Sequence, residues 1–380
     1  MEKQFKNVTF VSEDSYTPKK LFDSMDYVLV SPGICLLSYQ EYLDKILTEF
    51  DLFKLAWTGK IIAVTGTVGK TSVTHLLGTL LQSQRIPVLI GGNIGTGMLD
   101  LCLNKPQDIN QQACIAVLEL SSFQLEHVQK AAPDIAVITN IYPNHLDRHR
   151  SFQEYCAAKA RISTLQNSTQ VTLMPEELKV IPELSRGPGI KKYFSSEILK
   201  NISVPPISYP INWAIIYSVL EELQLPAHDI ISQVTPESLE LPHHRLEPIA
   251  TYNTVTWYND SKSTVPEATY MALSTLKNSP VILIAGGISK GVDRSNFLTQ
   301  LPPHVQTVIL FGAEATQLAK NAPHCPIIIV TTLQEAVLTA HTICPRPGTV
   351  LFSPGGASFD LFANYTERGE MFATCVRQLL

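Results

Sequence analysis

The chain has 380 residues, of which 45% are hydrophobic and 17% charged, so we expect a folded globular protein of two or three domains. The formal net charge of −5 argues against nucleic acid as a partner. No apolar run approaches the roughly 18 residues of a membrane span, and the first residues lack the apolar core of a secretory signal. Seven scattered cysteines without C-x-x-C pairs favour reduced thiols in the cytoplasm and no zinc site.

Short apolar runs alternate with helix-length amphipathic stretches almost throughout the chain. The runs predicted to be strands are 27–30, 60–66, 87–92, 114–120, 134–141, 255–260, 280–287, 305–312, 326–330 and 349–356. Continuous apolar strands separated by helices predict parallel sheets buried on both faces. In such sheets ligands bind beyond the carboxyl ends of the strands, where this chain places polar and glycine-rich sequence such as TGTVGK, GGNIG and SPGGASFD.

Two breaks in this alternation predict domain boundaries. One lies near 51–59, and the other lies near 236–246, where proline and polar residues interrupt the pattern. Between 166 and 211 the pattern is weak and proline-rich, which predicts loops and short strands. The expected domains are 1–55, 56–240 and 241–380.

The stretch VTGTVGKTSVTHLL, which starts at residue 64, lies between a predicted strand and a predicted helix. It contains Gly66-x-x-Gly69-Lys70-Thr71, a phosphate loop except that valine stands where the usual first glycine would be. Glycines let backbone N–H groups approach phosphate oxygens, and a helix N-terminus favours negative charge. We expect Lys70 to reach the β- and γ-phosphates and the Thr71 hydroxyl to bind magnesium. A chance strand–helix turn is the less favoured interpretation.

Three further side chains, in the region of the later strands, are candidates for the same site. Glu119 ends the strand at 114–120, where an acid beside a phosphate loop can hold magnesium, although taken alone it is more often merely exposed. His145 follows the strand at 134–141, on the same predicted sheet edge, and its imidazole could ligate or orient a metal. Lys159 lies on a predicted helix, and its spacing alone favours an ordinary solvated lysine.

Eight motifs in order resemble those of the Mur ligase family: GTVGKTS, GGNIG, LELSSFQLE, TNIYPNHLDRH, EYCAAKARI, PHHRLE, NDSKST and SPGGASFDLFANYTERGEMF. The match covers about 25–165 and 240–380 and is most similar to the D-glutamate-adding members. That family uses a shortened loop, G-T-x-G-K-[ST]-[ST], which accounts for the valine at 64. The resemblance implies an α/β, three-domain architecture: a truncated Rossmann-like N-terminal domain, a central parallel sheet of the P-loop ATPase type and a Rossmann-like C-terminal domain.

The resemblance also implies roles for individual residues. Lys70, His145 and Lys159 are expected to be catalytic, with Lys159 carbamylated so that an anionic oxygen, rather than an ammonium, faces magnesium. The expected metal ligands are Thr71, Glu119, His145 and Lys159. The expected ATP contacts are Gly66, Thr67, Gly69, Lys70, Thr71, Ser72, Asn93, Asn212, Arg245, Asp260 and Lys262.

Two more substrate sites are implied. A dianionic amino acid needs a fixed cation with hydroxyl or backbone donors, although each matching residue taken alone is as often an ordinary loop residue. The expected D-glutamate contacts are Thr264, Lys290, Ser358 and Phe359. The expected contacts of the UDP-substrate are Ser31, Pro32 and Gly33.

The chain departs from the family pattern in three places. Only about 55 residues precede the central domain, and the glycine-rich dinucleotide-like turn that binds uridine diphosphate in the family is absent from them. Residue 68 is Val where the family usually has Asn. The helix opening H-N-x-x-N keeps only its last residue, Asn212.

The activity implied is ATP-dependent amide ligation in peptidoglycan precursor synthesis. ATP would phosphorylate the carboxylate of UDP-N-acetylmuramoyl-L-alanine, and the amine of D-glutamate would attack the acyl phosphate, in a cytoplasmic monomer that uses ATP and Mg²⁺. One alternative is a ligase of the same fold for a different carboxylate, since the UDP-binding part is eroded. The other is a nucleotide-binding homologue without turnover, against which the retained Lys70, Glu119, His145, Lys159 and Lys290 argue.

Overall fold

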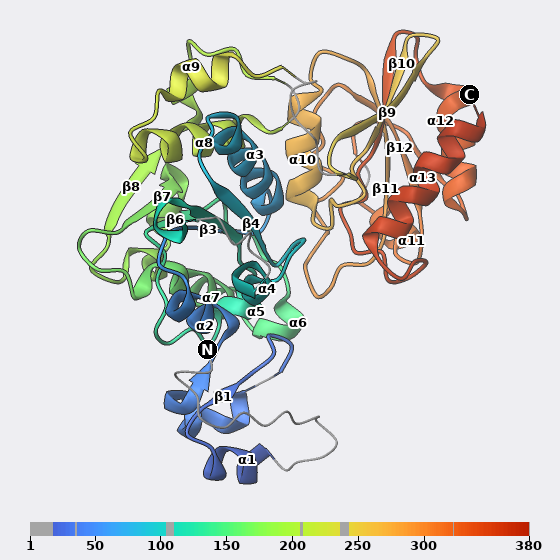
Figure 1. The fold of residues 1–380 in the computed structure, drawn as a ribbon. Coiled ribbons are helices and arrows are strands. Elements are labelled where there is room, and N and C mark those ends of the chain that lie inside the picture. The colour runs from blue at the N-terminus through green and yellow to red at the C-terminus, as the bar shows by residue number, and fades with distance from the viewer. Residues whose placement is uncertain are drawn as a thin grey trace. The chain divides into compact units, whose positions relative to one another are not determined.

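The computed structural model describes residues 18–34, 36–103, 110–205, 208–235, 243–321 and 323–379 (Figure 1). The chain divides into two compact units. The first consists of Met1–Ile141, Gln153–Ile198 and Ile215–Ala227, and the second of Tyr142–Phe152, Leu199–Ala214 and His228–Leu380. Within the described ranges, no helix is long and apolar enough to cross a membrane.

The first unit is built on a six-stranded sheet in which every pair of neighbours is parallel, in the order β4-β5-β3-β6-β7-β8. Its strands are β3 (Lys60–Thr65), β4 (Val88–Gly92), β5 (Ile115–Glu119), β6 (Ile135–Ile138), β7 (Val171–Pro175) and β8 (Ile190–Phe194). The predicted parallel central sheet is therefore confirmed. β7 and β8 arise from the proline-rich segment that predicted only loops and short strands.

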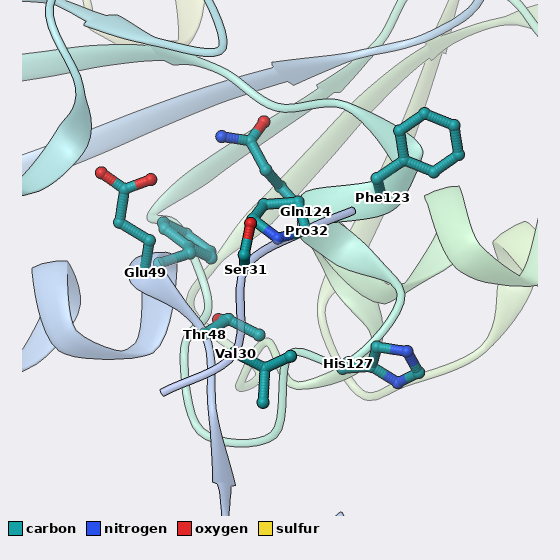
Figure 2. A pocket seen from close by; sticks show the side chains of 9 residues that line it. Val30, Ser31, Pro32, Thr48, Glu49, Phe123, Gln124 and His127 are labelled. Carbon is teal, nitrogen blue, oxygen red and sulfur yellow. The ribbon is translucent and has the colours of Figure 1, made fainter. Parts of the chain in front are cut away.

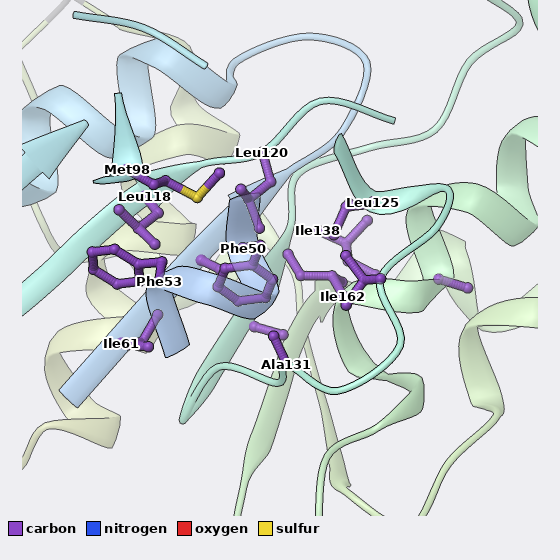
Figure 3. Close-up of a cluster of buried hydrophobic side chains, with 14 of the residues drawn as sticks. Phe50, Phe53, Ile61, Met98, Leu118, Leu120, Leu125, Ala131, Ile138 and Ile162 are labelled. Carbon is purple, nitrogen blue, oxygen red and sulfur yellow. The ribbon is translucent and has the colours of Figure 1, made fainter. Parts of the chain in front are cut away.

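Helices pack on this sheet through side chains that the sequence makes apolar on one face. The helices of the first unit are α2 (Glu49–Ala56), α3 (Lys70–Ser83), α4 (Met98–Leu103), α5 (Ser122–Leu125) and α7 (Phe152–Thr164). Helix α8 (Pro210–Glu222) belongs to this unit from Ile215 on. Figure 3 shows one core, in which Phe50 and Phe53 of α2 meet Ile61, Leu118 and Ile138 of three neighbouring strands. Burying such a side chain contributes about 1.5–3 kcal/mol, so this layer fixes the sheet beneath the site.

The described residues before the central sheet form a small substructure. β1 (Val28–Leu29) pairs in parallel with β2 (Ile46–Leu47), next to α1 (Pro18–Ser24) and the 3₁₀ segment Leu37–Lys45. Phe22, Leu36 and Ile46 form its core. β1 lies within the predicted strand at 27–30, whereas the two-residue β2 was not predicted.

The second unit carries a mixed six-stranded sheet, in the order β13-β12-β11-β14-β10-β9. Its strands are β9 (Glu247–Tyr252), β10 (Val255–Asn259), β11 (Val281–Gly286), β12 (Val305–Phe311), β13 (Ile327–Ile329) and β14 (Gly348–Phe352). All neighbouring strands are parallel except β9, which pairs antiparallel with β10. The expectation of parallel strands is wrong at this one edge, because Asn253 and Thr254 adopt positive φ and turn the chain straight back.

Helices of the second unit cover the two faces of its sheet with separate apolar clusters. They are α10 (Pro266–Thr275), α11 (Ala315–Leu318), α12 (Leu333–Ile343) and α13 (Tyr365–Leu379). The unit also contains α6 (Leu146–His149) and, from His228 on, α9 (Ala227–Ser232). One cluster joins Trp257 and Phe352 to Phe372 of α13, and the other joins Leu283 and Leu310 to residues such as Leu273 of α10. The predicted boundary at 55/56 stays a prediction, and the one at 240/241 lies within 236–242, outside the described residues.

Candidate active site

The phosphate-loop sequence forms the tight turn between β3 and α3. Gly66 has φ 143° and Gly69, at the N-cap of α3, has φ 88°. These conformations favour glycine, and a Cβ on Gly66 would also collide with the Thr139 hydroxyl. The two glycines therefore let the chain turn tightly into the start of a 14-residue helix, and a helix N-terminus suits an anion.

The two residues that follow β6 hold this loop in place through hydrogen bonds. The Val68 N–H donates to Asn140 Oδ1 at 2.9 Å, and Asn140 Nδ2 donates back to the Val68 carbonyl at 2.9 Å. Thr139 Oγ1 donates to the same carbonyl at 2.6 Å, and the Thr67 N–H donates to the Asn140 carbonyl at 3.0 Å. Thr139 and Asn140 were missed in the sequence, although TN directly follows a predicted strand.

Lys70 and the hydroxyls beside it line the same loop. Lys70 Nζ donates to the carbonyls of Gly66 at 3.0 Å and Thr67 at 3.1 Å, so the ammonium is folded back over the loop that it would share with a phosphate. Thr67 Oγ1 lies 3.0 Å from the Tyr155 hydroxyl, and Ser72 is buried in the first turn of α3.

Glu119 ends β5 as predicted, and the structure brings it to the loop. Its side chain is buried, with Oε2 accepting from Thr71 Oγ1 at 2.6 Å and Oε1 accepting from Asn93 Nδ2 at 3.0 Å. A carboxylate and a hydroxyl oxygen are hard ligands that suit Mg²⁺, which keeps several waters and substrate phosphates in its shell. The described residues contain no group of three or more His, Cys, Asp or Glu side chains that could hold a metal ion by themselves.

Lys159 is the most deeply buried charged group of the site, at 1% exposure on α7. Its Nζ donates to the Gly66 carbonyl at 2.8 Å and lies 4.7 Å from the centroid of the Tyr155 ring. Burial, and then the charge of Lys70, hold the pKa of Lys159 well below its ordinary value of 10.5, although Glu119 acts in the opposite direction. The interpretation drawn from spacing alone, a solvated lysine, is wrong.

The structure thus gathers many of the predicted residues around one loop. Those of the first unit that cluster there are Gly66, Thr67, Gly69, Lys70, Thr71, Ser72, Asn93, Glu119 and Lys159. The predicted residues that belong to the second unit are His145, Asn212, Arg245, Asp260, Lys262, Thr264, Lys290, Ser358 and Phe359. Their assigned roles stay predictions.

His145 caps α6 with φ 54°, and its N–H donates to Asn144 Oδ1 at 2.9 Å. Asn212 is fully buried at the start of α8, where its Nδ2 donates to Ser208 Oγ at 2.9 Å. Asp260 follows β10 and is also buried, and burial raises the pKa of its carboxyl from 3.8 to about 7. The Lys262 ammonium lies 3.5 Å from the centroid of the Tyr365 ring, a contact that the sequence did not indicate.

Two loops of the second unit carry the predicted amino-acid contacts. Lys290 follows β11 with φ 50°, and its Nζ lies 4.8 Å from the centroid of the Phe359 ring. Burial lowers the pKa of Lys290. Ser358 is buried after β14, whereas Phe359 is 59% exposed. Thr264 and Arg245 are half-buried.

A separate pocket of the first unit joins the segment after β1 to α5 (Figure 2). Of the three predicted UDP-substrate residues, Ser31 and Pro32 line it and Gly33 does not. Gln124 and His127, which the sequence did not assign, lie across from them. The remaining lining residues are Val30, Thr48, Glu49, Phe50 and Phe123.

The sequence of this chain is similar to those of known ligases. UDP-N-acetylmuramoylalanine–D-glutamate ligase of Nitrosomonas europaea is 32% identical to this chain, over 94% of the chain and 84% of the relative. The chain belongs to the Mur ligase family. The ligase of the same name from Desulfotalea psychrophila is 35% identical, over 93% of this Mur ligase and 82% of the relative.

The family profiles match both units of this Mur ligase. Residues 64–197 match the Mur ligase middle domain, and residues 244–356 match the Mur ligase glutamate ligase domain. Among solved structures, MurF ligase from Thermotoga maritima in complex with ADP has a TM-score of 0.63 at 17% identity, over 96% of this chain and 92% of that one. FolC from E. coli in complex with ADP has a TM-score of 0.60 at 15% identity, over 92% of this chain and 99% of that one. The α/β fold of the Mur ligase type that the sequence predicted is confirmed.

Proposed function

We propose that this Mur ligase joins D-glutamate to UDP-N-acetylmuramoyl-L-alanine, with cleavage of ATP to ADP and phosphate. The observation that carries the proposal is the convergence of Lys70, Thr71, Glu119 and Lys159 on one loop, in a chain whose relatives at 32–35% identity are named D-glutamate ligases. An amide bond from a carboxylate and an amine needs the carboxylate activated first, and a loop that binds triphosphate supplies the phosphoryl group.

The residues of the first unit would position and neutralise the phosphates. The N–H groups at the start of α3 and the Lys70 ammonium offer donors and positive charge to the β- and γ-phosphate oxygens. Magnesium held by Thr71 and Glu119 would supply further positive charge against the transferring phosphoryl group. Hydrogen bonds from Thr139 and Asn140 hold the loop in one position, which lowers the entropic cost of aligning the reactants.

Carbamylation of Lys159 is part of this proposal, and the burial of the side chain supports it. A lysine with a lowered pKa is more often neutral, and the neutral amine can attack the carbon of CO₂. The ammonium first loses one proton to give the neutral amine, an N–C bond then forms as one C=O bond of CO₂ opens, and a second proton leaves the nitrogen, so that the side chain ends as an anion. The buried like-charge contact with Lys70 is thereby replaced by an attractive one, and a carbamate oxygen would lie on the metal side of the loop.

The second unit would supply the amino acid and close over the nucleotide. The Lys290 ammonium and the Ser358 hydroxyl match the two carboxylates of D-glutamate, whose amine must stay unpaired to attack the acyl phosphate. We propose that Arg245, Asp260 and Lys262 contact ATP, with Asn212 beside the adenine. His145 is proposed to support the metal.

The pocket of Figure 2 is the place that we propose for part of the UDP-sugar substrate. Ser31 and Gln124 offer polar groups there, and His127 adds an imidazole. We further propose domains over 1–55, 56–240 and 241–380, in a monomer that acts in the cytoplasm.

A Mur-type ligase for a different carboxylate is the second candidate. It is favoured by the small size of the described N-terminal substructure, whose sheet has only two strands of two residues. A third possibility is a nucleotide-binding homologue without turnover.

One experiment separates the three. Phosphate release is measured with ATP and Mg²⁺ while UDP-N-acetylmuramoyl-L-alanine and D-glutamate are supplied together, singly or not at all. Release that requires both supports the proposal, and release that requires D-glutamate but accepts another carboxylate supports the second candidate. No release with any substrate favours the homologue without turnover. Lys70→Ala at full activity would refute the assignment of the loop.

A further inference from the structure

Two loops of the second unit are joined to each other by main-chain hydrogen bonds. Ile288 and Ala357 form a bridge in which each N–H donates to the other carbonyl, at 2.9 Å and 2.8 Å. One loop follows β11 and includes Lys290, and the other follows β14 and includes Ser358. The two loops therefore form one structural body, which carries two of the proposed D-glutamate contacts.

The Arg294 side chain is wedged between these loops. It is 3% exposed, and its guanidinium donates to the Gly286 carbonyl and the Gly287 carbonyl, both at 2.8 Å. The other loop leaves room for it, since a Cβ on Gly356 would lie 2.7 Å from Arg294 Nη1. Arg294 is therefore hydrogen-bonded to the first loop and packed closely against the second.

Glu314 closes the arrangement into a ring. One of its carboxylate oxygens accepts from Arg294 Nη1 at 3.1 Å, and the other accepts from the Ser289 N–H at 3.0 Å. The ring runs from Arg294 through the loop carbonyls to Ser289 and back through Glu314. Lys290 is the next residue and has φ 50°, a left-handed conformation that costs a side-chain-bearing residue about 1 kcal/mol or more and persists only where the surroundings impose it.

We infer that Arg294, held by Glu314, is a positioning residue for the amino-acid pocket and sets the affinity for D-glutamate through Lys290 and Ser358. This inference rests on the proposed function. None of Arg294, Glu314, Lys290 and Ser358 is among the residues that we propose to hold ATP or the UDP-sugar, so the affinities for these two substrates should not depend on the arrangement.

The test compares Arg294→Met, Arg294→Lys and Glu314→Gln with the native protein in full kinetics. Arg294→Met keeps most of the side-chain length and removes all donors, so the KM for D-glutamate should rise about tenfold or more, the factor that corresponds to about 1.4 kcal/mol. Arg294→Lys retains a charge that reaches one carbonyl but not both. Its KM for D-glutamate should therefore lie between those of the native protein and Arg294→Met. Arg377→Met, at an exposed position of α13, is the matched control and should change nothing.

A purely structural role would give a different result. Partial unfolding lowers the number of active molecules, so kcat would fall while every KM stayed the same. An unchanged KM for D-glutamate in Arg294→Lys and Glu314→Gln, or an equal rise in all three KM values, overturns the inference. These two variants carry the test if Arg294→Met does not fold. Turnover by the native protein without D-glutamate would refute the proposed function instead, whatever the variants do.

Discussion

Asp260 should make the second unit less stable as the pH rises from about 4 to about 7. Its carboxylate is buried, with Oδ1 accepting from the Leu246 N–H at 3.1 Å and Oδ2 from Ser353 Oγ at 2.7 Å. Burial raises its pKa from 3.8 to about 7, and these hydrogen bonds offset only part of the increase. Between the two values the native state keeps a proton that the unfolded chain has released.

The sign and size of the effect follow from proton linkage. Because the native state binds more protons, the free energy of unfolding falls with pH, by up to 1.36 kcal/mol per pH unit. The cost is absent below about pH 4 and complete above about pH 7. The interval from 3.8 to about 7 corresponds to roughly 4 kcal/mol, a large part of the 5–15 kcal/mol typical of a domain.

Asp260→Asn removes the titrating group and keeps its shape. Hydrogen exchange of peptides containing β10 and β14, compared at equal pH, reports the opening free energy of the second unit. The native protein should lose stability relative to the variant between pH 4 and 7.5. Asp293→Asn is the control, because Asp293 is exposed and hydrogen bonds from Ser295 lower its pKa, so its stabilisation is lost only in acid. A constant difference between the native protein and Asp260→Asn would refute the reasoning.

The remaining predictions concern the first unit. Lys70→Met should slow phosphate release about 100-fold or more at an unchanged melting temperature, and a normal rate would contradict its role. Gly66→Ala should destabilise the protein by about 2 kcal/mol or more in calorimetry, since a Cβ at φ 143° collides with Thr139; an unchanged melting temperature would show that the loop can shift. EDTA should stop phosphate release, and Glu119→Gln should raise the magnesium concentration for half-maximal rate about tenfold; equal magnesium dependence would remove Glu119 from the metal site.

Much of the fold was predictable because buried parallel strands are uniformly apolar. Each of the ten predicted runs overlaps a strand of the structure. Two strands outside those runs lack that signature: β9 is half-exposed at a sheet edge, and β8 is partly exposed and contains two lysines. Their places are decided by pairing with neighbouring strands rather than by their own composition.

The central cluster was predictable for a related reason. The carboxyl ends of parallel strands meet at one edge, so Lys70, Glu119 and Asn93 were expected to converge and do so. Lys159 was different, because a lysine among alanines on a helix gives no sign of whether the helix faces solvent. Arg294 was missed altogether, since two of its partners are main-chain carbonyls, which leave no trace in the sequence, and its side-chain partner Glu314 is distant along the chain.

Val68 shows how a departure inside a motif can leave its geometry intact. The hydrogen bonds that fix the loop reach the N–H and carbonyl of Val68, which any residue other than proline would present, and they come from Asn140 and Thr139. The Val68 side chain is only 9% exposed, and its burial is favourable because it is apolar. A polar side chain buried there would need hydrogen bonds to offset the cost of its desolvation. The position of the loop is therefore encoded in the residues after β6 rather than at position 68. It follows that a substitution at Asn140 should disturb the nucleotide site more than one at Val68.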